Sequence, residues 1–522
     1  MLKKLHGRKL AVCLIGGAMY AFFSAFGWQA EHGGVIWAGG ALLVAALLVW
    51  PIAALLAVLL ERGYTRALRR EKTFHAGRAF AFMLACYVPM FCVAFPGSFA
   101  YDVPYQLRQV VTGAYSTHHP LLHTLALGGL LQLGRALGDI NLGAALYTAL
   151  QMALLAGCFA LTCGSIARQS GARAAKRAAV FFALYPLNMV MAVNATKDVL
   201  FGGFFALTLA LLNEIREKPS RGLALKIAAC GALAVMLRNN MAYAALVWLA
   251  LLTIGLRKGE KSAALAMLLA LAVGLCGNAA LKRATRAESG DMSEMLSWPI
   301  QQLARARLYD EERLTDAEKE AIDELMPGEA WACYDPTISD PVKFEFDTQA
   351  FRADVKKYVG VWLSVGKKCA GTYLDATMAL TYPFFYPYRE YRVSGYYVQM
   401  GMSDAYDAGW CDFDPPESRS LFPRALASLS WRFGAKGAMQ IPVVGWLFNM
   451  GVIVWTMLFF ALREMYWGRW RRFGTALLPV LLWGTFLLGP VMAGRYIYPF
   501  VCALPVLAAR PGRIVKEAER HG

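Results

Sequence analysis

The sequence predicts an all-α membrane protein that crosses the bilayer about twelve times. Of its 522 residues, 57% are hydrophobic and only 17% are charged, and the mean hydropathy is +0.40. Soluble domains of this length rarely have such a composition. Apolar runs long enough to cross a hydrocarbon core of about 30 Å as helices recur along almost the whole chain. These observations favour a polytopic membrane protein over any soluble class.

Each apolar run is expected to form one transmembrane helix. The predicted spans are Leu10–Trp28, Val35–Leu60, Ala79–Phe95, Leu142–Ile166, Ala178–Val193, Val199–Leu212, Leu223–Leu237, Met241–Leu256, Ala263–Leu281, Ile441–Leu462, Thr475–Val491 and Tyr496–Ala509.

The distribution of charge orients these spans. Lysine and arginine concentrate in alternate loops, as cytoplasmic loops require, if every predicted span crosses and the run 120–138 does not. Both termini are then cytoplasmic, and the chain is a plasma-membrane protein whose loop 96–141 faces the extracytoplasmic side. Segment 282–440 holds 19 basic and 24 acidic residues, whereas the rest holds 34 and 12. The formal charge of +17 therefore reflects membrane topology, and no nucleic-acid partner is expected.

Four parts follow from this topology. Residues 1–77 form two leading transmembrane helices, the first expected to stay as an anchor because no cleavage site follows its apolar run. Residues 78–281 form a core of about seven transmembrane helices, with the external loop 96–141. Residues 282–440 form a small α-rich external domain that is partly interfacial. Residues 441–522 form three more transmembrane helices and a cytoplasmic tail.

Several features of the external domain have both a structural and a functional interpretation. Its aromatic run 382–401 fits an aromatic belt at headgroup level, or a platform for a sugar or lipid. Asp412 and Asp414 have a D-x-D spacing compatible with a divalent cation, although solvated turn residues explain it as well. Three external cysteines permit at most one disulfide among them, namely Cys333, Cys369 and Cys411.

Asp102 is the candidate catalytic residue. Of the 12 acidic residues outside the external domain, four fall on the external face of the helical part. Asp102 follows the third span after a short turn, which holds its carboxylate near the membrane surface. A partly desolvated carboxylate there suits a general base for a hydroxyl, and the alternative is a helix cap or turn acid.

Polar residues beside Asp102 extend the candidate site. Gln106 lies one helical turn beyond it, Arg108 follows, and "STHHP" supplies His118 and His119. Residues 121–138 then form an interfacial or re-entrant helix that begins after Pro120. His119 and His123 have an i, i+4 spacing that is compatible with binding of zinc. No third ligand follows in a recognisable pattern, so we assign no metal and no certain cofactor.

Basic residues at other external helix ends complete the set. Lys197 and Asp198 lie between the fifth and sixth spans, where Asp198 is also a candidate helix cap. Arg238 follows the seventh span, and Arg495 and Tyr496 begin the last one. Each cation has a snorkelling alternative. Together they favour a pocket for an anionic lipid headgroup, because guanidinium and ammonium groups donate to phosphate.

These residues resemble a known superfamily. The first-loop carboxylate, the seven-helix core, the cations at neighbouring helix ends and a late "RYxxP" are similar to the GT-C polytopic glycosyltransferases, which include the protein O-mannosyltransferases and the aminoarabinose transferase of lipid A. The motifs "FPGSFAYDVPYQ", "THHPLLHT", "NATKDVLF", "MLSWPIQQLAR" and "SDPVK" resemble, more closely, an uncharacterised bacterial membrane family placed within that superfamily.

The resemblance implies an activity and its partners. It implies inverting transfer of a sugar from a polyprenyl-phosphate donor to a glycan, lipid or protein acceptor, with Asp102 as general base. It also implies that Lys197, Arg238 and Arg495 bind the lipid phosphate. The O-mannosyltransferases carry an Asp-Glu pair in this loop, whereas Val103 follows Asp102 here. The sugar, the acceptor and a need for metal are therefore not carried over.

Two other functions remain open. A transporter or flippase of a lipid-linked or anionic substrate also has about twelve helices, but such proteins place charges near mid-membrane within internal repeats. Here the charges lie at external helix ends, and no repeat is apparent. A polymerase or ligase of surface glycans is the other alternative. Neither a Gly-rich nucleotide loop nor a Walker motif occurs, which agrees with a lipid-linked donor.

Overall fold

The computed structural model describes residues 5, 7–32, 39–62, 73–253, 258–387, 400–402, 415–434 and 441–510. Within these ranges every regular element is a helix, and backbone bridges occur only as isolated pairs. The all-α prediction is confirmed for this part of the chain.

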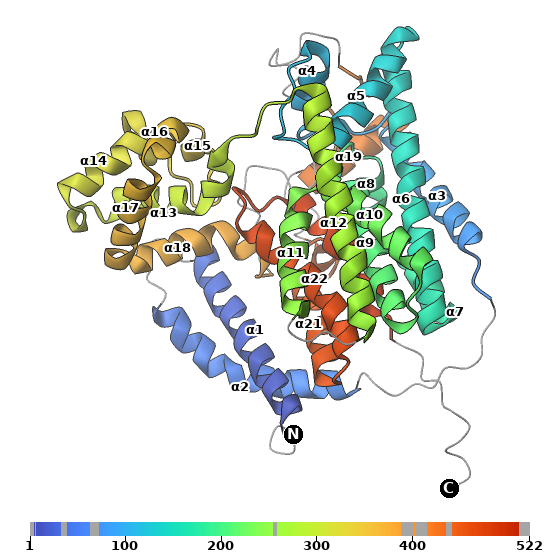
Figure 1. Cartoon of the computed structure of the whole chain (residues 1–522), viewed down its shortest axis with the longest axis horizontal. Coiled ribbons are helices and arrows are strands. Elements are labelled where there is room, and N and C mark those ends of the chain that lie inside the picture. The colour runs from blue at the N-terminus through green and yellow to red at the C-terminus, as the bar shows by residue number, and fades with distance from the viewer. Residues whose placement is uncertain are drawn as a thin grey trace.

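The α-helices run in chain order as follows (Figure 1): α1 (Arg8–His32), α2 (Gly39–Arg62), α3 (Ala76–Val93), α4 (Val103–Thr112), α5 (Leu121–Ala136), α6 (Ile140–Ser170), α7 (Ala172–Leu184), α8 (Pro186–Ala192), α9 (Lys197–Glu217), α10 (Arg221–Leu237), α11 (Asn239–Thr253), α12 (Lys258–Thr285), α13 (Ser297–Tyr309), α14 (Asp316–Leu325), α15 (Asp340–Lys343), α16 (Thr348–Ala353), α17 (Val355–Lys368), α18 (Ala370–Thr381), α19 (Pro423–Gly434), α21 (Met450–Tyr466), α22 (Trp470–Leu487) and α23 (Tyr498–Ala508).

Six of the described helices are long and apolar enough to cross a membrane, namely α1, α2, α3, α6, α9 and α12. The apolar α11 and α23 are shorter. The chain is thus a multi-pass helical membrane protein, and the figure of about twelve crossings stays a prediction.

Two predicted spans have a different form: Ile441–Leu462 is α-helical only from Met450, and a second span is divided in two. The run 178–193 was expected to be a single helix, but it comprises the end of α7 and the short α8, which meet at Tyr185. Tyr185 is extended (ψ 120°) because a residue before proline avoids the helical conformation, and Pro186 then begins α8. The prediction of one continuous helix here was wrong.

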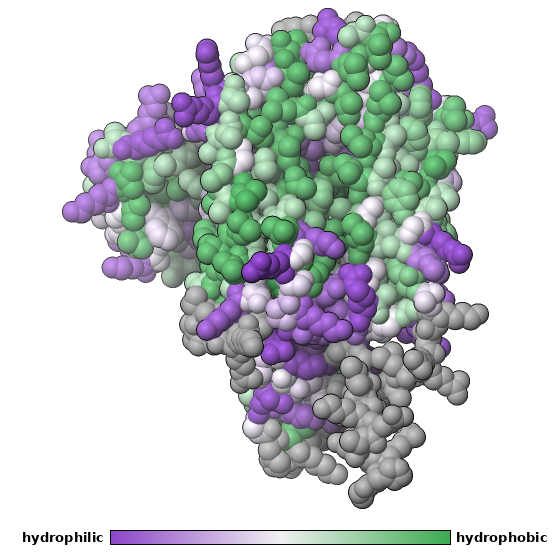
Figure 2. Space-filling model, turned by 45° about the vertical axis from the view of Figure 1, so that its right-hand side comes forward, coloured by the Kyte–Doolittle hydropathy of each residue, from purple (hydrophilic) through white to green (hydrophobic). Residues whose placement is uncertain are grey.

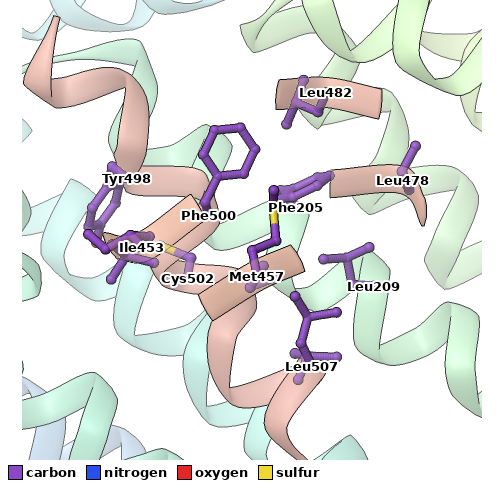
Figure 3. Packing of buried hydrophobic residues seen from close by; sticks show 14 of the residues in the cluster. Phe205, Leu209, Ile453, Met457, Leu478, Leu482, Tyr498, Phe500, Cys502 and Leu507 are labelled. Atoms are coloured by element: carbon purple, nitrogen blue, oxygen red, sulfur yellow. The ribbon is translucent and has the colours of Figure 1, made fainter. Parts of the chain in front are cut away.

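The core of the bundle forms around α9. In its apolar window 83% of the residues are buried, against 17% in α2 and in α3. It packs against α6, α10 and α23. Close contact with α23 depends on Gly202, where an added Cβ would lie 2.9 Å from the sulfur of Cys502. Figure 3 shows side chains of α9, α21, α22 and α23 packed together, including Phe205, Met457 and Phe500.

The outside of the bundle is apolar, as expected for helices that face lipid. Large hydrophobic side chains are exposed along α2, α6 and α12, for example Leu47, Leu161 and Leu265. Figure 2 shows a broad hydrophobic zone with hydrophilic residues gathered above and below it. This arrangement fits burial of the zone in a bilayer.

The helices α13–α18 form a small domain with a hydrophobic core of its own, which includes Ile300, Ile322 and Val365. The domain lies beside the upper part of the bundle (Figure 1). Backbone pairing of Ile338 with Val491 attaches it to the loop between α22 and α23. The regular elements among the described residues of segment 282–440 are helices, whereas the bounds of the domain and its external position stay predictions.

The two ends of the bundle are built differently. At the lower end of Figure 1, Lys9 near the start of α1 forms an ion pair with Glu61 at the end of α2. Arg463 of α21 donates to the carbonyl of Leu507 at the end of α23. The upper end carries α4 and α5 (Figure 1), and Lys197 at the start of α9 and Arg495 just before α23 contact the start of α4.

Candidate functional site

Two loops at the upper end are joined by backbone hydrogen bonds. The loop after α3 runs beside the loop after α8, where Ser98 N–H donates to the carbonyl of Val193 at 2.8 Å and Ala195 N–H donates to the carbonyl of Ser98 at 2.8 Å. This pairing fixes two chain segments about 95 residues apart. Asp102 and Lys197, which follow these contacts, are thereby brought together.

Asp102 occupies the N-cap position of α4, but its side chain makes no capping hydrogen bond. Instead, Oδ2 accepts from Lys197 Nζ at 2.8 Å and Oδ1 accepts from Arg495 Nη2 at 3.1 Å. The helix-cap alternative therefore does not explain this aspartate. Its carboxylate holds two cations from distant parts of the chain, at the start of α9 and just before α23.

Arg495 connects Asp102 to a second, fully buried ion pair. Arg495 Nε lies 3.7 Å from Asp198 Oδ2, and Arg238 Nε donates to Asp198 Oδ1 at 2.5 Å. We call the five linked side chains, Asp102, Lys197, Asp198, Arg238 and Arg495, the ion cluster. Three cations and two carboxylates give it a net charge of +1.

Aromatic rings surround the guanidinium groups of the ion cluster. The Arg238 guanidinium lies 4.5 Å from the ring centres of both Phe486 and Tyr496. The Arg495 guanidinium lies 4.5 Å from the ring of Tyr101, a residue with a positive φ of 55°. Stacking on these rings fixes the planes of the two guanidinium groups.

The charges of the ion cluster decide the protonation state of Asp102. Burial alone raises the pKa of its carboxyl group, but the positive charges of Arg495 and Lys197 outweigh burial and hold the pKa well below its ordinary value. Asp102 is therefore ionised at neutral pH while both cations stay beside it.

Some polar atoms of the site are buried without a hydrogen-bond partner. They include Nε and Nη1 of Arg495 and Nδ1 of His119. The His119 ring is 6% exposed, and its Nδ1 lies 3.8 Å from Asp102 Oδ2. Buried polar atoms without partners are costly, and the two guanidinium donors favour a ligand that supplies acceptors at this position.

Of the remaining residues predicted for the site, two are buried or half-buried and two are exposed. Gln106 is buried and its amide donates to Thr124 Oγ1 at 2.9 Å. Tyr496 is half-buried against the guanidinium groups. Arg108 and His118 are exposed, and the structure brings neither into the ion cluster.

The expectation that Asp198 caps α9 is not met. Thr196 occupies the N-cap position, and no side chain makes a capping bond there. The carboxylate of Asp198 is occupied by Arg238 and by the hydroxyl of Thr196, which donates at 3.3 Å. The ion pair with Arg238 takes precedence over capping.

A buried polar network behind the ion cluster was missed by sequence reasoning. Tyr147 of α6 donates to Gln151 Oε1 at 3.0 Å and lies 2.9 Å from His123 Nε2. Gln151 in turn donates to the carbonyls of Ala192 and Asn194, just before Lys197. Single polar residues inside apolar helices gave no pattern that could have identified this network.

The structure gives no support to a zinc site on His119 and His123. Both ring nitrogens of His123 have neighbours, Tyr147 at Nε2 and the Gln106 amide at Nδ1. Within the described residues no three His, Cys, Asp or Glu side chains gather as metal ligands would. Asp412 and Asp414 lie outside these residues.

The described residues include only part of the predicted cysteine set and of the predicted aromatic run. Cys333 and Cys369 are both free thiols, whereas Cys411 lies outside the described residues. Most of the aromatic run 382–401 also lies outside them, at 388–399.

Fold and site define a class of protein: a multi-pass helical membrane protein with a buried, net-positive ion cluster at one end of its bundle. The chain belongs to DUF6020, a family of unknown function, because the model of that family matches residues 112–521. The match includes Lys197, Asp198, Arg238 and Arg495 and begins ten residues after Asp102. No curated protein and no solved structure matches the chain.

Proposed function

We propose that this protein is a membrane glycosyltransferase of the GT-C type, which moves a sugar from a polyprenyl-phosphate donor to an acceptor hydroxyl at the extracytoplasmic face. The observation that carries the proposal is the position of Asp102 between Lys197 and Arg495, at bonding distances of 2.8 and 3.1 Å. A base and two phosphate-binding cations are the groups that such a transfer requires.

The charge of the ion cluster suits a donor with one phosphate. A polyprenyl-phosphate sugar is a phosphodiester and carries one negative charge, which neutralises the net charge of +1. A diphosphate-linked donor would leave an excess negative charge in a buried site, which is costly. This count supports a monophosphate donor.

Donor binding would also activate the base. Lys197 and Arg495 hold Asp102 as a weakly basic carboxylate in the free protein. A phosphate that takes over their hydrogen bonds raises the pKa of Asp102 and leaves it able to accept a proton. The site would thus become reactive only when the donor is bound.

In the transfer step one bond forms, one bond breaks, and one proton moves. The acceptor oxygen attacks the anomeric carbon from the side opposite the phosphate, and Asp102 takes the hydroxyl proton. The bond between the anomeric carbon and the phosphate oxygen breaks, and its electron pair stays on the polyprenyl phosphate. Lys197 and Arg495 stabilise the added charge, an effect worth about 3–4 kcal/mol per well-placed donor. The product has inverted configuration.

The surroundings of the ion cluster are consistent with a lipid-linked donor. The bundle below it is apolar on its outside, so a polyprenyl chain can lie in the bilayer while its phosphate reaches the helix ends. The lower end carries basic residues, among them Arg168, Arg463 and Arg472, as cytoplasmic loops do. This asymmetry supports an extracytoplasmic site.

A transfer assay tests the proposal. The purified protein is incubated with radiolabelled polyprenyl-phosphate sugars and membrane extract as a source of glycan, lipid and protein acceptors. Wild type should transfer label from at least one donor, and Asp102→Asn should not. Equal transfer by both proteins would remove Asp102 from the role of base.

The same preparation distinguishes the alternative function. Proteoliposomes that move a lipid-linked or anionic substrate across the bilayer, without sugar transfer, would make the protein a transporter or flippase. Orientation is tested with Tyr105→Cys, at a position that is 40% exposed beside the site, in a protein whose exposed Cys276 and Cys333 are replaced by serine. A membrane-impermeant thiol reagent should label it in intact cells, and labelling only after lysis would contradict the assigned side.

A further inference from the structure

His119 is the one neutral side chain that reaches the ion cluster with an unused nitrogen among the described residues. Its ring is 6% exposed, and Nδ1 is buried and has no hydrogen-bond partner. The nearest charged atom is Asp102 Oδ2, at 3.8 Å. Pro120, which starts α5, directly follows His119 and fixes the backbone at this position.

The surroundings of His119 keep it neutral in the free protein. Burial lowers the pKa of its imidazole well below the ordinary value, which outweighs the opposing charge of Asp102. The other facing groups are the cations Lys197 and Arg495, the neighbouring imidazole of His118, and Tyr105, whose ring centre is 6.4 Å away. A neutral imidazole carries one proton on its two ring nitrogens, so His119 arrives at the reaction able to accept a second one.

His119 and Asp102 are close but form no hydrogen bond in the free protein. A separation of 3.8 Å exceeds the hydrogen-bond range of about 2.7–3.2 Å. In the neutral tautomer that carries its proton on Nε2, Nδ1 and the carboxylate oxygen both present lone pairs, so they do not bond to each other. One proton added to the pair creates a charge-assisted hydrogen bond between them, which is stronger and shorter.

We propose that His119 relays the transferred proton: Asp102 takes the proton from the acceptor hydroxyl, and His119 Nδ1 then accepts it from Asp102. This inference rests on the proposed transferase function. The carboxylate is regenerated, the imidazole becomes imidazolium, and the proton passes to solvent on the side of the exposed His118, whose ring centre is 4.6 Å away. Asp102 can then bind Lys197 and Arg495 again after the phosphate leaves.

Chemical rescue tests the relay. His119→Ala should lower kcat about 10²-fold, the lower range of proton-transfer contributions, and leave the KM for the donor within a few-fold. Added imidazole should restore kcat in proportion to its concentration, because it fits the space left by the ring and accepts the same proton. His75→Ala is the matched control and should keep kcat, because His75 is an exposed histidine at the start of α3 with no contact to the ion cluster.

A second variant separates the relay from phosphate binding or packing. His119→Gln retains a polar side chain of similar length that donates to phosphate but cannot take the proton. A relay predicts the same loss of kcat as in His119→Ala. Near wild-type kcat in His119→Gln, or a raised KM without any response to imidazole in His119→Ala, would overturn it.

The two hypotheses fail in different ways. If wild type transfers no sugar from any donor, the proposed function fails. If wild type transfers sugar and both His119 variants retain its kcat, only the relay fails.

Discussion

Both ends of the bundle bury charged side chains, but they use them differently. At the lower end, Arg463 forms an ion pair with Glu464 and donates to the carbonyls of Leu507 and Ala508. Arg472 donates to the carbonyl of Ala509. These guanidinium groups cap the end of α23, where the helix dipole and unpaired carbonyls favour cations.

At the upper end, the cations bind side-chain carboxylates rather than helix ends. Lys197 and Arg495 converge on Asp102, which itself does not cap α4. The side-chain carboxylate of Asp102 can release its cations to an incoming phosphate. The backbone carbonyls at the end of α23 are held in place by the helix. The lower end is therefore built for stability, and the upper end suits exchange of a carboxylate for a ligand.

The largest expected effect of a single change comes from Asp102. Asp102→Asn removes the base but retains the shape of the side chain, so the transfer rate should fall about 10²–10⁴-fold. Initial rates with labelled donor measure the loss. Asp139→Asn is the control, because Asp139 also begins a helix at this end and does cap it. An equal loss in both variants would contradict a specific role for Asp102.

Arg495 and Arg463 give the sharpest comparison of the two ends. Arg495→Ala removes a phosphate donor and should lower kcat about 10²–10³-fold. Arg463→Ala removes one of the two arginines paired with the buried Glu464, the other being Arg469, so it should cost about 1–3 kcal/mol of stability without changing kcat per folded protein. Thermal unfolding in detergent and turnover of the folded fraction separate the two. The reverse pattern would contradict the division between the ends.

The pair of Arg238 and Asp198 should be important for both stability and activity. Asp198 is fully buried, so Asp198→Ala leaves Arg238 and Arg495 without this counter-charge and should destabilise the protein by about 3–5 kcal/mol. The midpoint of thermal unfolding measures the loss. The double variant Asp198→Asn with Arg238→Gln should be less unstable than Asp198→Ala, because no unpaired buried charge remains at this pair. No recovery would mean that the pair does not act as a unit.

The smallest effect is a dependence of stability on pH. Burial lowers the pKa of His123 from its ordinary value of 6.5 to about 4. Between these values the unfolded chain binds a proton that the folded chain does not, so the free energy of unfolding falls as the pH falls from 6.5 to 4. The slope is about 1.4 kcal/mol per pH unit for each such histidine.

Thermal unfolding at a series of pH values measures this slope. His123→Gln should flatten it, because glutamine keeps a polar contact to Tyr147 and does not titrate. The exposed His118 is the matched control, and His118→Gln should leave the slope unchanged. An unchanged slope in His123→Gln would show that His123 is not protonated on unfolding.

The sequence supports prediction where the physical signal is local. The long apolar runs that became α1, α6 and α9 are readable from hydropathy alone. The break before Pro186 could not be predicted from the proline alone, because Pro51 and Pro89 lie inside the continuous helices α2 and α3.

The site required contacts that no local pattern contains. Asp102 could be selected because few acids lie on the external side, yet its partner Arg495 is 393 residues away. The role of Asp198 as the partner of Arg238 depends on how α9 and α10 pack, not on its place at a helix start. Such pairings follow from tertiary packing and become visible only in three dimensions.

Binding of polyprenyl phosphate, the expected leaving group, tests the central claim most directly. Radiolabelled polyprenyl phosphate is titrated into wild type, Lys197→Ala, Arg495→Ala and Arg463→Ala in detergent. Wild type and Arg463→Ala should bind alike, and the two upper-end variants should bind about 10–100-fold more weakly, as the loss of one charge-assisted hydrogen bond predicts. Equal affinity in all four proteins would contradict a phosphate site at the ion cluster.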